Sequence, residues 1–137
     1  MSAALALQKA IRARLVSDPG VLALVPAGNI IDGHGGPKSF PAILIGEDLE
    51  TASDLTMDRR HITVYLTLHA WSHEPGMTDV KAIVEAIRKA IQTPVQIEAP
   101  DRLIDLRFEA ARFVRDVDTL TAHGVVTLEA VVEESLV

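Results

Sequence analysis

A run of ten residues from Ile62 to Trp71 alternates between apolar side chains and polar or aromatic ones. Successive side chains of a β-strand point to opposite faces, so this period of two predicts one long strand with an aliphatic face and a mixed face. The mixed face carries Tyr65, His69 and Trp71. The fold must therefore contain a sheet whose aliphatic face is covered by another layer.

Segments on both sides of this strand have helical periodicity. Apolar residues recur at helical spacing in segment 7–15, which is followed by the helix-ending Pro19, and in segment 80–91. We expect Thr78 or Gly76 to cap the second of these helices. The sequence therefore predicts two main helices.

Three further segments have strand patterns. Segment 42–46 is a compact apolar run, and segments 104–110 and 125–134 alternate between apolar and polar residues. The adjacent Ala110–Ala111 shifts the apolar phase, which indicates a bulge or bend. With the strand at 62–71, these segments predict about four strands.

The connections between these elements complete the predicted fold. Residues 47–60 are polar and acidic and are expected to form a solvated loop, residues 119–124 a turn, and residues 26–41 an irregular connection with a short extended piece at 29–31. The order of elements predicts an α+β fold, in which a mostly antiparallel sheet of about four strands has two main helices packed on one face. A chain of this length is expected to form one domain, residues 1–137.

The composition narrows the function classes. The 137 residues carry a net charge of -6 and include no cysteine, which removes thiolate metal sites and cysteine nucleophiles. The thirteen basic residues are scattered along the chain, so sequence-specific DNA binding is not expected. No apolar run reaches the roughly 18 residues that a membrane-spanning helix needs, so we expect no membrane partner.

His69 and His73 first suggest a metal site. They would share one face of a strand, but four residues of strand separate them by about 13 Å at about 3.3 Å per residue. Two imidazole nitrogens that bind one zinc ion have to lie within roughly 3–4 Å of each other. The spacing argues against a shared ion, and we assign no metal ligand and no cofactor.

The loop Gly33–Gly36 suggests a different chemistry. It has glycines like those of an oxyanion-hole loop or a phosphate loop, but the chain has no G-x-S-x-G elbow, and His34 stands where a phosphate loop needs lysine. A flexible glycine loop explains the segment better. A small-molecule or metal-binding or hydrolytic domain that uses His69, His73 and this loop remains the alternative function.

The acidic residues supply no recognisable catalytic pair. Asp116 and Asp118 flank a turn, and Glu133 and Glu134 lie near the C-terminal end of the sequence. General acid–base catalysis needs carboxyl groups that converge in a pocket with shifted pKa values. We expect these carboxylates to be exposed and solubilising, we predict no catalytic residue, and we expect the chain not to be an enzyme.

The aromatic face of the long strand is the strongest candidate site. Tyr65, His69 and Trp71 lie on its mixed face, and aromatic residues are enriched at the centres of protein interfaces. Two interpretations are open at this point. Either these side chains contact a neighbouring chain, or a second layer of the same chain, such as the first helix, covers them.

The order of the segments resembles one family of phage proteins. A leading helix is followed by NIIDGHGGPKSFPAILIGED, a long strand ending in LHAWSHEPG, the helix DVKAIVEAIRKAI, and RFEAARFVRDVDTLTAHGVVTLEAVVEE. The chain resembles the tail-completion or tail-terminator (head–tail joining) proteins of long-tailed phages and gene transfer agents over nearly its whole length. The cues are Phe40–Pro41, Trp71–Ser72 with Gly76, Arg115–Asp116 and His123–Gly124.

This resemblance implies a structural role. Proteins of this kind form rings, generally hexameric, that cap the head-proximal end of the tail tube and join the tail to the head. The implied partners are further copies of the chain, the tail tube protein and the head-connector or stopper protein, and DNA passes through the channel without specific binding. The implied location is the tail or neck of a virion or phage-like particle, assembled in the bacterial host cytoplasm. A closed ring needs two different patches on each subunit, and we expect the Tyr65, His69 and Trp71 face or the segment 47–60 to supply part of a subunit or tube contact.

Overall fold

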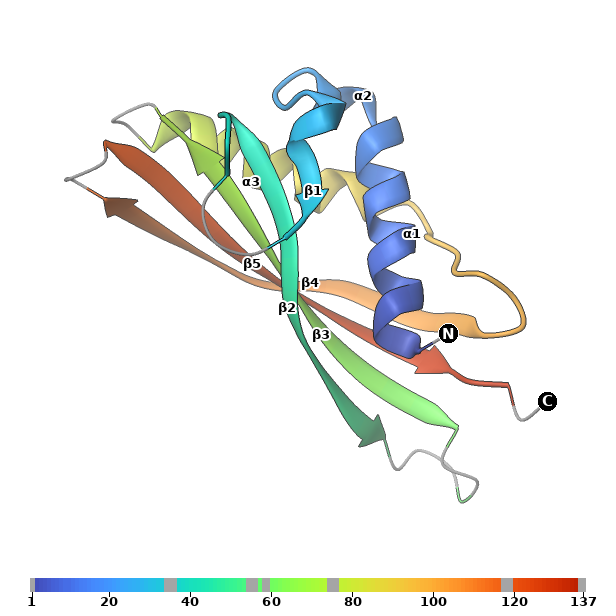
Figure 1. Ribbon diagram of the computed structural model, residues 1–137. Coiled ribbons are helices and arrows are strands. Elements are labelled where there is room, and N and C mark those ends of the chain that lie inside the picture. Colours follow the sequence, from blue (N-terminus) through green and yellow to red (C-terminus); the bar gives the residue numbers. More distant parts are fainter. Residues whose placement is uncertain are drawn as a thin grey trace.

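The computed structural model describes residues 2–33, 37–53, 57, 60–73, 77–116 and 120–135 (Figure 1). The helices in these ranges are α1 (Ala3–Ser17), α2 (Pro19–Leu22), the 3-10 helix η1 (Ala27–Asn29) and α3 (Thr78–Ala90). The strands are β1 (Ile30–Asp32), β2 (Ala42–Ser53), β3 (His61–Ser72), β4 (Arg102–Asp116) and β5 (Thr121–Glu133). In the ranges just given, no helix is both long enough and apolar enough to cross a bilayer.

The strands form one twisted sheet in the order β1-β2-β3-β5-β4 (Figure 1). The pair β1–β2 is parallel, and the other three pairs are antiparallel. The α+β prediction is confirmed in outline, because helices and a mainly antiparallel sheet are both present. The described sheet nevertheless has five strands and is mixed, and α2 is a third α-helix. The three-residue β1 was expected only as a short extended piece, since it is too short to show a period.

The core lies between the aliphatic face of the sheet and the helices. β3 contributes a fully buried alternating set, and so does β5, which pairs with it along its length. α1 and α3 cover these residues with one apolar stripe each, as helical periodicity predicts. The largest completely buried side chains include Leu7, Ile11, Leu15, Leu66, Leu68, Ile87 and Leu128.

Strand β2 corrects the first half of the loop predicted at residues 47–60, of which residues 54–56, 58 and 59 lie outside the described residues. The strand continues past Gly46 to Ser53, and residues from Asp48 onward pair with β3 after a bulge at Glu47, whose φ is 53°. Residues 47–52 are all exposed, so this half of the strand shows no apolar alternation. Its strand character comes from the backbone hydrogen bonds of β3, which the sequence pattern does not report.

Two element boundaries also differ from the sequence predictions. β5 begins at Thr121, so most of the expected turn at 119–124 is strand. Met77 is the N-cap residue of α3 and makes no side-chain cap bond; Gly76 lies outside the described residues. A bulge is present as expected, but it lies just before Ala110–Ala111, between Phe108 and Ala110, and a second shift lies between Leu103 and Asp105.

Candidate functional site: the helix-free face of the sheet

No described helix packs on the second face of the sheet, which we call the open face. Its central part consists of the odd-numbered residues of β3 and β5, which alternate with the buried core residues. α1, which we considered as a cover for Tyr65, His69 and Trp71, packs instead with the core on the aliphatic face. All three residues are half-buried, and Trp71 and His69 contact His123 of the neighbouring strand β5. The open face remains the candidate interface.

Antiparallel pairing brings a second histidine to the site. His123 lies opposite Trp71, and their rings stack with centroids 3.8 Å apart and planes 8° apart. His69 Nδ1 lies 2.7 Å from His123 Nε2, and His69 Nε2 lies 3.1 Å from Glu47 Oε1. A carboxylate only accepts hydrogen bonds, so His69 Nε2–H donates to Glu47, and Nδ1 of the same ring shares a hydrogen bond with His123 Nε2. The bulge at Glu47 places this carboxylate beside β3.

The same environment keeps His123 uncharged. Burial lowers the pKa of His123 to about 4, with further lowering by the nearby positive charges of His69 and Arg112, while Glu47 acts in the opposite direction. The cluster at neutral pH is therefore a stacked, hydrogen-bonded platform with a neutral His123 ring. Trp71 Nε1–H is buried and has no acceptor in the part of the chain that the structure describes.

The depressed pKa of His123 predicts acid-dependent stability. Between its ordinary pKa of 6.5 and the folded value of about 4, unfolded chains bind a proton that folded chains do not. The free energy of unfolding should therefore be highest above pH 6.5 and fall by about 1–2 kcal/mol toward pH 4, after allowing for partial exposure of the ring. Urea unfolding across this pH range measures the effect. His123→Phe retains an aromatic ring but cannot titrate, so its pH slope should be shallower; an unchanged slope would contradict the assignment.

His69 and His73 do not form a common site. The His73 ring contacts Phe40, with centroids 3.8 Å apart, whereas both ring nitrogens of His69 are engaged by His123 and Glu47. His73 also lines an open pocket with Pro41 and Ser72. In the described ranges, no group of three or more histidine, aspartate or glutamate residues could hold a metal ion. Residues 34–36 of the glycine loop lie outside those ranges.

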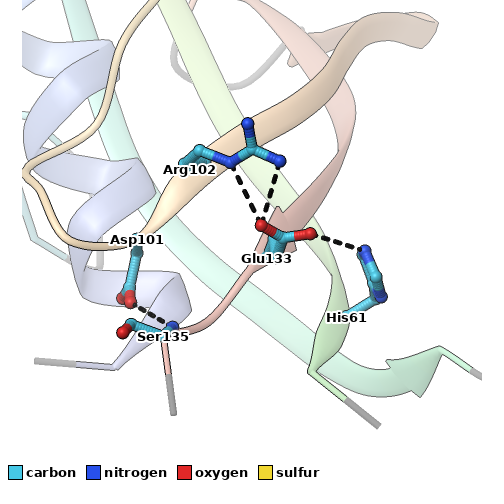
Figure 2. Close-up of polar contacts among 5 residues, drawn as sticks. All are labelled: His61, Asp101, Arg102, Glu133 and Ser135. Atoms are coloured by element: carbon cyan, nitrogen blue, oxygen red, sulfur yellow. Dashed lines mark hydrogen bonds and ion pairs between the residues drawn. The ribbon is translucent and has the colours of Figure 1, made fainter. Parts of the chain in front are cut away.

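A charged network at the far end of the open face corrects the expectation for Glu133. Glu133 on β5 accepts a hydrogen bond from Arg102 Nε at 3.1 Å and forms an ion pair with Arg102 Nη2 at 3.0 Å, and its other oxygen lies 3.3 Å from His61 Nε2 (Figure 2). Its side chain is only 20% exposed, and that of His61 is 10% exposed. Asp101 accepts from the backbone N–H of Ser135 at 3.0 Å (Figure 2). Glu133 thus connects β3, β5 and β4, whereas the sequence suggested a solubilising carboxylate.

The network predicts a difference between two adjacent glutamates. Glu133→Gln keeps the side-chain size but removes the charge that Arg102 and His61 face, and we expect a loss of about 1–2 kcal/mol in the free energy of unfolding at neutral pH. Glu134→Gln is the matched control, because its side chain makes no ion pair in the described part of the chain. Chemical denaturation measures both. Equal losses in the two variants would contradict a structural role for Glu133.

A row of arginines on β4 was not predicted from the sequence. Arg102, Arg107 and Arg112 are five residues apart, a spacing that alternates faces in a regular strand. The two bulges of β4 cancel this alternation, so the three residues lie opposite Glu133, Glu129 and Val125 of β5. Arg107 pairs with Glu129 at 2.6 Å. The five-residue spacing of the arginines is present in the sequence. It indicates a shared face only when the two bulges and the β4–β5 register are known.

Comparison with known proteins places this fold in a family. Residues 9–133 match the family model of the tail completion protein gp17. A chain in the solved virion of a native gene transfer agent (GTA) particle has the same fold, with a TM-score of 0.81, 23% sequence identity, and coverage of 97% of this chain and 99% of that chain. No curated protein matches the sequence. The chain therefore belongs to the tail completion protein gp17 family, and it is a structural assembly protein of a phage-type tail.

Proposed function

We propose that copies of this chain form a ring that caps the head-proximal end of a phage-type tail tube and helps to join it to the head. The resemblance to the family implies that this ring has six copies. The observation that carries this proposal is the family match over residues 9–133. The shared fold with a chain of a gene transfer agent virion, over nearly the full length of both chains, supports it. The same coverage and the single hydrophobic core support one tail-terminator-like domain over residues 1–137.

The geometry suits an assembly function without chemistry. Both nitrogens of His69 are engaged within the fold, and the carboxylates Glu129 and Glu133 are paired with arginines of β4. The open face of the sheet presents aromatic and threonine side chains to partners. Tyr65, His69 and Trp71 form part of the proposed contact with a neighbouring copy or with the tube. The proposed ring makes no covalent change in its partners, and DNA passes through its channel without specific binding.

Electron microscopy of the assembled particle tests the proposal. A map of phage-like particles made with this chain should show it as a closed ring between the last tube layer and the head connector. Particles made without the chain should have tails of uncontrolled length or tails detached from heads. Density for the chain elsewhere in the particle, or normal tails in its absence, would overturn the proposal. Light scattering on the purified chain adds the copy number if the ring closes without the tube.

A further inference from the structure

The two edges of the sheet carry charges of opposite sign. At one edge, the end of β4 carries Arg112 and Arg115, with no acidic residue between Glu109 and Asp116. Near the other edge, β2 carries Glu47, Asp48 and Glu50, and no lysine or arginine occurs between Lys38 and Arg59. Because β2 and β4 lie on opposite sides of the β3–β5 pair, these patches lie on opposite flanks of the subunit (Figure 1).

Both patches are open to a partner. β1 pairs only with Ile43–Ile45, so the rest of β2 has no strand along its outer edge in the described part of the chain. Arg112 and Arg115 are exposed and, unlike Arg102 and Arg107, have no carboxylate partner among the described residues. Asp48 is likewise exposed without a described partner, whereas Glu47 bonds to His69 and Glu50 accepts from Ala4 N–H at the start of α1.

Both patches have side chains on the open face and on the helix side of the sheet. Arg112 and Val114 lie on the open face at the end of β4, and Leu49 lies on the same face of β2. Arg115 and Asp48 both lie on the helix side, opposite the buried Ala122 and Leu66. Leu49 is 58% exposed and Val114 is 43% exposed, so each patch adds an apolar side chain to its charges.

The signs of these charges determine which sheet edges of two copies can contact each other. Charged side chains on a free edge normally prevent sheets from joining edge to edge. Two β4 edges would bring arginines together and two β2 edges would bring carboxylates together, so both two-fold contacts are disfavoured, while β4 against β2 is favoured. An unlike, head-to-tail contact forms a closed ring when the rotation between successive copies closes. We infer that, in the proposed ring, residues 112–115 of one copy contact residues 47–52 of the next copy.

Charge reversal and rescue test this contact, which rests on the proposed ring. The double variant Arg112→Glu/Arg115→Glu should form rings at least tenfold more weakly than the wild type, measured by mass photometry or, where rings close only on tubes, by the fraction of tails that carry a cap. Asp48→Lys should also weaken assembly, and combining Asp48→Lys with Arg115→Glu should restore part of it, because the pair is present with its signs exchanged. Lys9→Glu on α1 is the matched charge reversal at an exposed residue outside residues 47–52 and 112–115, and it should assemble normally.

The outcomes separate this inference from the function on which it rests. Circular dichroism and melting temperature show whether each variant is folded, and the single variant Arg115→Glu replaces the double variant if the latter does not fold. Folded variants that assemble as the wild type does, or a combined variant weaker than both single ones, would overturn the β4–β2 contact and leave the ring in place. A wild-type chain absent from the tube end would instead overturn the proposed function.

Discussion

Trp71→Ala is expected to weaken ring or tube assembly about 30-fold or more, the range of an interface hot spot near 2 kcal/mol. Trp71 lies half-buried on the open face as part of the proposed contact, and its ring stacks on His123. Truncation would remove both the aromatic contact surface and the support of the histidine platform. Assembly can be measured by the fraction of capped tails in particles that carry the variant.

Two further variants distinguish assembly from folding in this experiment. Trp71→Phe keeps an aromatic ring on His123 and should retain most of the stability, so an assembly defect in this variant would report on the contact itself. Leu22→Ala truncates an exposed apolar side chain on α2, away from the open face, and should assemble normally. Normal assembly by a folded Trp71→Ala variant would remove Trp71 from the proposed interface.

Gly124→Val is expected to lower the free energy of unfolding by about 1–3 kcal/mol through overpacking. Gly124 lies on the helix side of β5, where α3 approaches closely. A Cβ atom there would lie 3.0 Å from Val84 Cγ2 and 3.2 Å from Val80 Cγ2, and both side chains belong to α3. The helix would have to move away from the sheet, and the buried contacts around it would loosen. Denaturant or thermal unfolding measures the loss.

A double-mutant cycle identifies the cause of that loss. Gly124→Ala adds the single Cβ atom and should cost less than Gly124→Val. Combining Gly124→Ala with Val84→Ala removes the Cγ2 atom that the new Cβ meets, so the pair should cost less than the sum of the two single changes. Additive losses would show that close approach of α3 is not the reason for glycine at this position. The φ of Gly124 lies outside the left-handed region, so backbone strain does not contribute to the expected loss.

The sequence predicted the elements whose side chains alternate with a single period. β3 and α3 were found because one face of each is buried against the core, so selection for burial leaves a period of two or of 3.6 in the residues. The sequence predicts a loop for the far half of β2, because both of its faces are exposed and its strand conformation depends on pairing with β3. β1, at three residues, is too short for any period to be recognised.

Some features of the candidate site could likewise be predicted from the sequence, and others depend on the tertiary structure. The sequence by itself determined that Tyr65, His69 and Trp71 share one face, because strand geometry is local. It also determined that His69 and His73 are too far apart along a strand to bind one ion. Only the tertiary structure placed His123 against His69 and Trp71, Glu133 between Arg102 and His61, and three arginines on one face of β4. These contacts join residues that are far apart in the sequence, and they depend on strand register and on bulges, which side-chain periodicity within a single segment does not determine.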